Sequence, residues 1–235
     1  MNISDLRLNQ FIALFALLSP MLLLAGCASS SSAPETYDGL VLVPDTKFGQ
    51  VYLLPGADLA SYSEYGLDKC EVAFKKNWLR NQNNSRIDLG NRVTQKDVDR
   101  IKDTLGAECE TYFREALETP PAYPLVENFS DGENVLVLRP SIINLDISAP
   151  DTRSAGMQRS YTTQAGEMTL VLEMLDGTTG QMLVRIVDRY RAPQTSWLQW
   201  TNAVTNQAEA RRVLSRWAGQ LRKGMDQVIR TSANQ

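Results

Sequence analysis

The chain has 235 residues, with 24 basic and 27 acidic side chains and no histidine. This near balance of charge gives no reason to expect nucleic acid as a partner. Without histidine, the chain cannot build a Ser-His-Asp or Cys-His catalytic set, a histidine-bearing zinc site or a histidine general base. Only three cysteines are present, and one of them is assigned to lipid below, so a multi-thiolate metal centre is also excluded. We therefore expect no metal and no cofactor.

Residues 1–26 are typical of a secretory signal peptide. Arg7 precedes an apolar run, Phe11–Leu24, which Pro20 interrupts. The run is about 14 residues long, whereas a membrane-spanning helix needs roughly 20, so a permanent span is the weaker interpretation. It leads into Leu24-Ala25-Gly26-Cys27, which resembles the bacterial lipobox, in which the cysteine becomes the first mature residue and its sulfur takes the lipid. The alternative is a leader in which Cys27 is incidental.

The segment after the signal peptide, residues 27–36, consists of the lipidated cysteine and a serine-rich tether. Nine flexible residues give a typical reach of roughly 17 Å. The remainder, 37–235, is predicted to be a single periplasmic domain held close to a membrane by several acyl chains. Ala28 stands where an aspartate would signal retention in the inner membrane. By resemblance to enterobacterial sorting rules, this favours the outer membrane, on its periplasmic face.

The first part of the domain mixes short apolar runs with polar segments. Leu40–Pro44 and Val51–Gly56 are apolar, and Pro55-Gly56 marks a turn. Alternation of apolar and polar side chains predicts a strand between Tyr65 and Phe74. The polar stretch Asn81–Arg92 has no periodicity and is predicted to be an exposed loop.

A long helix is predicted next. Thr94 and Asp97 have the spacing of an N-cap and its capping-box partner. Apolar residues then recur at spacings of three and four up to about Leu117, which places them on one helical face. These residues are Val98, Ile101, Leu105, Cys109, Tyr112 and Ala116. Pro120 and Pro121 end the helix.

After Pro124 the pattern changes to extended segments. They are Leu125–Phe129, Asn134–Ile147, Glu167–Leu175 and Met182–Tyr190. A five-residue connection, Asp176–Gly180, joins the last two as a hairpin, and Pro150–Gly166 is predicted to be a loop. Pro140, within the second segment, indicates an edge strand or a bulge.

Ala208–Ile229 is predicted to be a closing helix, because apolar side chains return along one helical face. The elements thus follow in the order strand, helix, four strands, helix. This order predicts an α+β fold of two layers, with a mostly antiparallel sheet covered by two main helices, behind a cleaved lipoprotein signal peptide.

Several short pieces, in a shared order behind the lipobox, resemble a known family. They are Tyr52–Tyr62, Asp176 with Thr179-Gly180, Val187-Asp188-Arg189, Ser196-Trp197, and Trp217-Ala218 with Leu221-Arg222. Together they are similar to a family of uncharacterised proteobacterial lipoproteins defined only by a domain of unknown function. The resemblance covers nearly the whole mature chain and implies an α+β periplasmic domain, with no particular activity. The chain departs from the family between Pro150 and Gly166, where other members carry a longer apolar insertion.

The two remaining cysteines are candidates for a disulfide. Cys70 lies on the same strand face as Val72 and Phe74, and Cys109 lies on the apolar face of the next helix. Both therefore point into one strand-helix interface, and an oxidising periplasm favours a bond between them. On the chain-entropy model, closing a loop of about 40 residues stabilises the fold by roughly 4 kcal/mol. The alternative is a pair of buried free thiols that pack as small apolar side chains.

Two classes of function stay open. The first is a non-enzymatic lipoprotein that serves as a docking or accessory component of the cell envelope, with the membrane and an envelope protein as its partners. The second is an envelope hydrolase that uses a carboxylate pair, as glycosidases do. The candidate carboxylates are Asp146, Glu173, Asp176 and Asp188. A turn explains Asp176 and polar or salt-bridged strand positions explain the others, so we name no catalytic residue.

Two surface features are candidates for contacts. The basic residues of the closing helix either contact lipid phosphates or form its exposed polar side. They are Arg211, Arg212, Arg216, Arg222 and Lys223. Trp197 and Trp200 flank a segment without a regular pattern and form a candidate interaction patch. The alternative is that the two indoles cover one end of the core.

Overall fold

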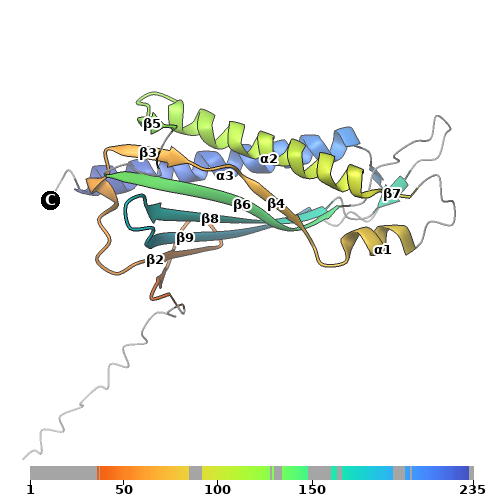
Figure 1. Ribbon diagram of the computed structural model, residues 1–235, viewed down its shortest axis with the longest axis horizontal. Helices are drawn as coiled ribbons and strands as arrows, with labels where there is room; N and C mark the ends of the chain where they lie inside the picture. The colour runs from red at the N-terminus through yellow and green to blue at the C-terminus, as the bar shows by residue number, and fades with distance from the viewer. Residues whose placement is uncertain are drawn as a thin grey trace, which may run out of the picture. The chain divides into compact units, whose positions relative to one another are not determined.

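The computed structural model describes residues 36, 38–84, 92–127, 129, 134–147, 160–162, 166–192, 199–201 and 203–232. All of them belong to one compact unit, Ala33–Gln235. Its fold is α+β, with long helices running beside a sheet (Figure 1). The predicted signal peptide, Cys27, the tether up to residue 35 and most of the predicted loop between Pro150 and Gly166 lie outside the described residues.

Among the described residues, eight strands form the main sheet in the order β1-β2-β9-β8-β6-β3-β5, and β4 also pairs with β6. Their bounds are Val41–Val43 (β1), Gln50–Leu53 (β2), Glu64–Leu67 (β3), Glu71–Phe74 (β4), Leu125–Val126 (β5), Val135–Ile147 (β6), Gly166–Asp176 (β8) and Met182–Arg191 (β9). Two short strands, β7 (Ser160–Thr162) and β10 (Gln199–Thr201), pair with each other. The four segments predicted after Pro124 therefore form strands β5, β6, β8 and β9.

The helices of the described residues are α1 (Trp78–Asn84), α2 (Gln95–Glu118) and α3 (Ala203–Ser232), with a 3-10 turn, η1 (Leu59–Ser61). The predicted capping box opens α2: the Asp97 N–H donates to the Thr94 side chain, and the Thr94 N–H donates to the Asp97 carboxylate. The predicted loop Asn81–Arg92 is wrong in its first four residues, which belong to α1. These residues are polar, and Trp78 is the one fully buried residue of the helix, so the sequence pattern gives little sign of α1.

The sheet is mixed: its antiparallel part agrees with the prediction of a mostly antiparallel sheet, and its parallel part was not predicted. The pairs from β1 through β2, β9 and β8 to β6 are antiparallel. By contrast, β3 and β4 pair with β6, and β3 pairs with β5, in parallel. The physical reason is the connection through α2, because a crossover helix returns the chain so that the next strand runs in the same direction. The spacing of apolar residues does not report strand direction.

The predicted strand between Tyr65 and Phe74 is interrupted by residues 68–70. β3 pairs with the first part of β6, at Val135 to Leu138, and β4 pairs with a later part that starts at Ser141. The two strands thus lie along β6 as one broken strand. Cys70 directly precedes β4 instead of lying within a strand.

Pro140 lies opposite this interruption, in a central strand and not at the predicted edge. The Leu138 carbonyl accepts a hydrogen bond from the Asp68 N–H. The backbone groups of Pro140, two residues further on, face the same side, where the ladder is broken. The N–H that proline lacks is therefore not needed there. A bulge does occur in β6, at Asn144 (φ 53°), where β6 has one residue more than its neighbours.

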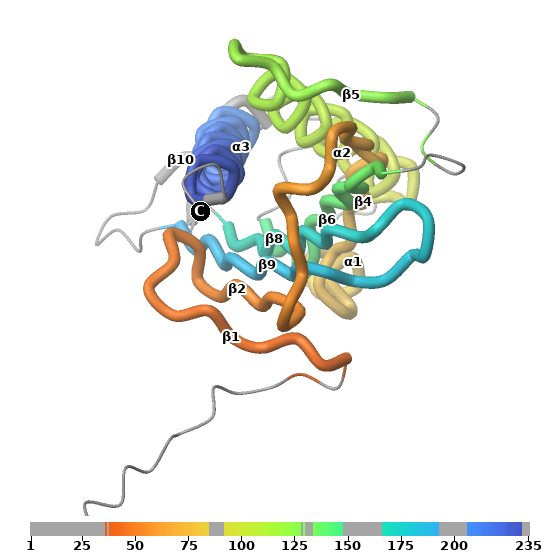
Figure 2. Tube along the Cα trace, turned by 90° about the vertical axis from the view of Figure 1, so that its left-hand side faces the viewer, coloured from red at the N-terminus to blue at the C-terminus, as the bar shows by residue number. Residues whose placement is uncertain are grey.

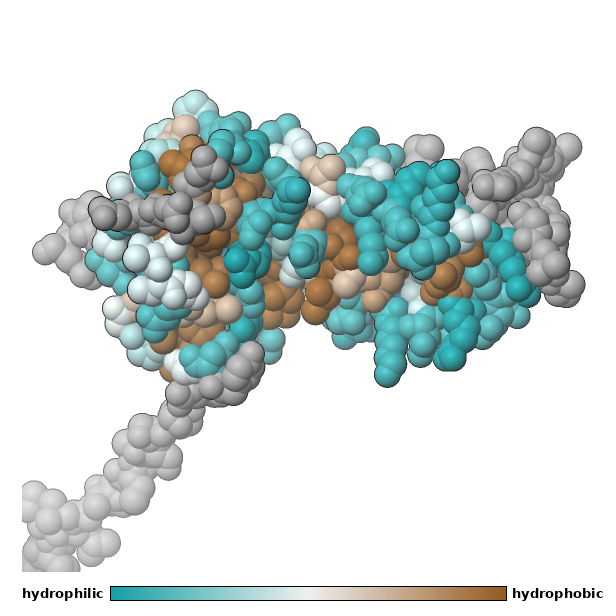
Figure 3. All heavy atoms as spheres, in the orientation of Figure 1, coloured by the Kyte–Doolittle hydropathy of each residue, from teal (hydrophilic) through white to brown (hydrophobic). Residues whose placement is uncertain are grey.

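One hydrophobic core contains residues of the sheet, α2 and α3. Alternate residues of β8 are buried in it, namely Met168, Leu170, Leu172 and Met174. The other face of β8, which carries Glu167 and Glu173, is called the outer face below. Figure 2 shows α2 and α3 together on one side of the strands and the start of the described chain on the other. Hydrophilic residues occupy most of the face seen in Figure 3, with hydrophobic bands between them.

Candidate functional site

A disulfide joins Cys70 to Cys109 of α2, with the two Cα atoms 6.1 Å apart. Both residues are buried. Gly106 lies one turn earlier on α2, and a Cβ atom at this position would meet the Cys70 carbonyl oxygen at 2.7 Å. The absence of a side chain lets α2 approach the backbone before β4 closely, which brings the two thiols within bonding reach.

Asp188 of β9, one of the candidate carboxylates, lies on the core side of the sheet, opposite Leu170. It accepts hydrogen bonds from the Trp217 indole N–H at 2.6 Å and from the Gly49 N–H at 3.0 Å. The guanidinium of Arg216 lies 3.6 Å away. Because fixed donors occupy the carboxylate oxygens, Asp188 joins α3 and the segment before β2 to the centre of the sheet.

Asp176 ends β8 and organises the hairpin that follows. It accepts hydrogen bonds from the Thr179 N–H at 2.6 Å and hydroxyl at 2.7 Å, and from the Tyr62 hydroxyl at 2.7 Å. Burial, with the hydrogen bond to Asp176, raises the pKa of Tyr62 to about 12. The same bond holds the pKa of Asp176 below its ordinary value. The sequence predicts the turn, whereas the link to Tyr62 arises only from the fold.

Arg222, predicted to belong to a basic surface, is 9% exposed. Its guanidinium donates to the carbonyl oxygens of Thr119 and Pro121, both at 2.6 Å, just beyond the C-terminus of α2. It also donates to Asp226 at 2.8 Å and lies 4.7 Å from the centre of the Tyr123 ring. Carbonyls at a helix C-terminus lack partners within the helix, so Arg222 caps α2 from α3.

Three other basic residues of α3 have acidic partners, which fits the alternative of an exposed polar helix side better than contact with lipid phosphates. The pairs are Arg211–Glu108, Arg212–Glu209 and Arg216–Asp188. Lys223 is exposed. Most of the positive charge of this helix is therefore balanced within the chain.

Asp146 and Asp176 lie at the two ends of β8. In the pairing of β6 with β8, Asp146 is opposite Glu167, and Asp176 is the last residue of β8. Nine residues of strand separate these positions, or about 30 Å. The two carboxylates of a glycosidase lie about 5 to 9.5 Å apart, so Asp146 and Asp176 do not form such a pair.

Glu173 and Asp188 lie on opposite faces of the sheet. Glu173 is on the outer face, 3.3 Å from Arg185, whereas Asp188 faces the core. Asp146 shares the outer face but lies about 20 Å along β8 from Glu173, and it pairs with Lys75 at 2.9 Å. Each of the four candidates therefore has its own partner, and the fold does not bring them together.

The candidate interaction patch lies mostly beyond what the structure describes. Trp197 is outside the described residues, and Trp200 is described only by its backbone, in β10. A contact role for these two indoles stays a prediction.

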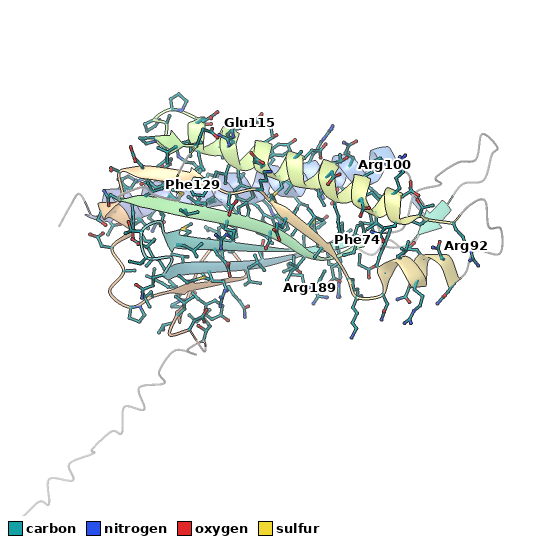
Figure 4. The ribbon with its side chains drawn as sticks, in the orientation of Figure 1. Phe74, Arg92, Arg100, Glu115, Phe129 and Arg189 are labelled. Carbon is teal, nitrogen blue, oxygen red and sulfur yellow. A yellow bond between two sulfur atoms is a disulfide. The ribbon has the colours of Figure 1, made fainter. Side chains whose placement is uncertain are left out.

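A groove of about 560 Å³ opens between the end of β4, α1 and the first turns of α2. Its apolar lining includes Phe74 and Leu79, and three cations, Lys75, Arg80 and Lys102, line it as well. No lining residue is acidic. We call this the cationic groove; Figure 4 shows Phe74 where β4, α1 and α2 approach one another.

Trp78 fixes the walls of the cationic groove. It is 3% exposed, its indole N–H donates to the Ile147 carbonyl at 2.9 Å, and its ring lies 4.1 Å from that of Phe74. It also packs with Val93 and Val98 in a second small core. The sequence interpretation missed this groove because α1 was predicted partly as loop. The spacing of four between Phe74 and Trp78 was the available signal.

The described part of the chain contains no group of three or more cysteine, aspartate or glutamate side chains placed to hold a metal ion. Nor does any helix in that part have the length and hydropathy needed to cross a membrane.

The fold and these contacts define an α+β domain with a mixed sheet, in which polar side chains fasten α3 to the sheet and to the end of α2. The sequence matches the model of a family of proteins of unknown function, DUF3313, over residues 29–221, and the chain belongs to this family. The predicted relation to a domain-of-unknown-function family is thus confirmed.

Two solved structures are similar to this chain at low sequence identity. A PelC dodecamer from Paraburkholderia phytofirmans is 9% identical, with 73% of this chain and 96% of that chain covered and a TM-score of 0.36. Protein XCC0632 from Xanthomonas campestris is 12% identical, with 77% and 93% covered and a TM-score of 0.39. No curated protein matches the sequence. Similarity this low says nothing about the activity of this chain.

Proposed function

We propose that this protein is a lipoprotein anchored on the periplasmic face of the outer membrane, and that its domain is a non-enzymatic docking or accessory component of the cell envelope. In this proposal, residues 1–26 are cleaved, Cys27 carries the lipid and the tether up to residue 36 leads to the domain. The two long helices then form a layer over the sheet. An envelope protein is the expected partner besides the membrane.

The observation that carries the proposal is the Cys70–Cys109 disulfide. Disulfides persist in oxidising compartments such as the bacterial periplasm and are rare in the cytosol. The disulfide agrees with the export that the sequence Leu24-Ala25-Gly26-Cys27 predicts. Two independent features of the chain therefore favour the same compartment.

The positions of the four candidate carboxylates support the non-enzymatic part of the proposal. Asp188 and Asp176 hold parts of the fold together, and Asp146 and Glu173 pair with cations on the outer face. A chain without histidine depends on such carboxylates for acid and base chemistry. Their separation favours docking over hydrolysis.

Changing Cys27 to serine tests the anchor. Cells that express Cys27→Ser and are fed a labelled fatty acid should yield an unlabelled, unprocessed precursor, because the sulfur that accepts the lipid is gone. The double variant Cys70→Ser/Cys109→Ser is the matched control and should keep its label. A Cys27→Ser protein that is processed normally and stays in the membrane would refute the anchor.

Crosslinking in the native envelope tests docking. The anchored protein should yield a defined crosslinked envelope protein, and the Cys27→Ser variant should lose it, because docking needs the anchored location. Recovery of nothing above background from the anchored protein would contradict the docking role.

A further inference from the structure

The cationic groove is positively charged, in contrast to the chain as a whole. Lys75, Arg80 and Lys102 line it without an acidic neighbour in the lining. Lys75 is paired with Asp146 at 2.9 Å, whereas Arg80 and Lys102 have no acidic partner within the residues that the structure describes. The whole chain has a formal net charge of −3. Two unneutralised cations in one groove of an acidic protein favour an anionic ligand.

Both of these cations stand on fixed backbone. Arg80 is on α1, which the buried Trp78 holds in place, and Lys102 lies one turn after Val98 of α2. Trp78 and Val98 pack against each other in the second small core. Guanidinium and ammonium groups on two neighbouring helices match the oxygens of a phosphate.

The groove also has an apolar part. Phe74 and Leu79 belong to its lining, and Figure 3 shows a small hydrophobic area among hydrophilic residues where β4 meets α1. An inorganic anion has no apolar part that would pack on such a surface. A phosphate joined to a glycerol and acyl chain, by contrast, fits both the cations and the apolar lining.

One rim of the cationic groove, at Lys75, and the start of the domain lie on the same face of the sheet, whereas Lys102 stands on α2 on the other side of the strands. Asp38, next to the tether, pairs with Arg185 at 2.7 Å, and Arg185 contacts Glu173 on the outer face. Lys75 pairs with Asp146, which is opposite Glu167 on the same face. The two places are six residues of β8 apart, or about 20 Å. The tether therefore leaves the domain within about 20 Å, along the sheet, of the Lys75 rim of the groove.

We propose that the cationic groove binds the phosphate of an anionic phospholipid in the leaflet that holds the anchor, with Arg80 and Lys102 as the main contacts. The inference rests on the proposed function, because the lipid anchor is what brings the domain to a leaflet. It adds a defined lipid-binding site on the folded domain.

Vesicle sedimentation tests the site without the anchor. The protein is residues 33–235, the compact unit that contains every described residue, and the probes are vesicles of phosphatidylglycerol or of phosphatidylcholine. Binding is expected only to the anionic vesicles. The variant Arg80→Gln/Lys102→Gln should bind about 25-fold more weakly, because each basic residue at an anionic surface contributes roughly fivefold.

The matched control is Lys47→Gln/Lys223→Gln, which removes two exposed cations outside the groove. It makes the same change in net charge and should retain the affinity of the unaltered protein. Equal losses in the two variants would mean diffuse attraction to the surface and would overturn the site, as would no loss in either. Unfolding midpoints of both variants should equal that of the parent, which excludes misfolding as the cause.

Two soluble probes separate the lipid from other anions. If inorganic phosphate or a glutamate-rich peptide binds through Arg80 and Lys102 while phosphatidylglycerol vesicles do not, the lipid assignment is wrong. The test is also independent of the anchor: failure of lipid labelling at Cys27 would overturn the proposed location. Failure of the vesicle assay would overturn the groove alone.

Discussion

At the scale of single residues, the guanidinium of Arg222 makes three kinds of contact at the same time. It donates to two carbonyls beyond α2 while it pairs with Asp226 and lies over the Tyr123 ring. A planar group with five donors makes this combination, whereas an ammonium would not. The burial of Arg222 therefore follows from its partners.

Replacing Arg222 by methionine should destabilise the fold by about 3 kcal/mol, because the helix carbonyls and Asp226 lose a buried charged partner. Methionine keeps the apolar stem, so the loss reports the polar contacts. Urea unfolding measures the change. The neighbouring exposed residue supplies the control: Lys223→Met should alter stability by less than about 0.5 kcal/mol. Equal effects at the two positions would contradict the capping role.

The pair Tyr62 and Asp176 predicts an alkaline dependence of stability. The folded state raises the pKa of Tyr62 from 10 to about 12, so its contribution is complete below pH 10 and is lost as the pH rises towards about 12. Tyr62→Phe should remove this part of the pH dependence, as seen in unfolding midpoints measured through that range.

Tyr52→Phe is the control, since no hydrogen bond of the Tyr52 hydroxyl is found among the described residues. Its pH dependence should follow that of the unaltered protein. Parallel curves for Tyr62→Phe and the unaltered protein would show that the Tyr62–Asp176 bond does not form.

At the scale of elements, α2 is held to the sheet by a close approach and a covalent bond. Gly106→Ala should destabilise the protein by about 1 to 3 kcal/mol, because the new Cβ meets the backbone of Cys70 at 2.7 Å. Gly224→Ala in α3, where nothing lies within 4 Å of a Cβ, should instead stabilise by about 0.5 to 1 kcal/mol. Thermal unfolding of both variants measures the contrast. Stabilisation by Gly106→Ala would disprove the close approach.

The disulfide closes a loop with a sequence separation of 39, so its reduction should lower the free energy of unfolding by about 4 kcal/mol. Alkylation of the non-reduced protein, followed by mass spectrometry, should find no free thiol at Cys70 or Cys109. Labelling of both cysteines would rule out the bond.

The elements with a strong local signal were predictable. The capping box of Thr94 and Asp97 marks the start of α2, and the alternation of apolar residues marks β8 and β9. The end of α1 was missed because its residues are polar and Trp78 is the one buried residue of the helix. The parallel pairing of β3, β4 and β6 was missed because it is set by the path of the chain through α2, which local periodicity does not encode.

At the scale of the whole molecule, several of the sequence pieces on which the predicted family resemblance was based have structural roles. Asp188 and Trp217 bond to each other, Asp176 orders a hairpin and Arg222 caps a helix. The turn at Asp176 is local, and the sequence alone predicted it. The Asp188–Trp217 bond and the cap by Arg222 join residues far apart in the sequence, and the sequence alone did not predict them. The cationic groove depends on three separate elements and was not predictable from any one of them.

The sheet joins the two ends of the domain, because β2 pairs with β9 and the bond between Gly49 and Asp188 spans 139 residues. A chain delivered from its N-terminus presents β1 and β2 long before β9. During that interval they form at most an isolated two-stranded hairpin, which is marginal by itself, and folding is delayed by these distant pairings. If translocation stops before Met182, β1 and β2 are delivered without β9. The edge of β2 that would pair with β9 then stays open and exposed to neighbouring chains.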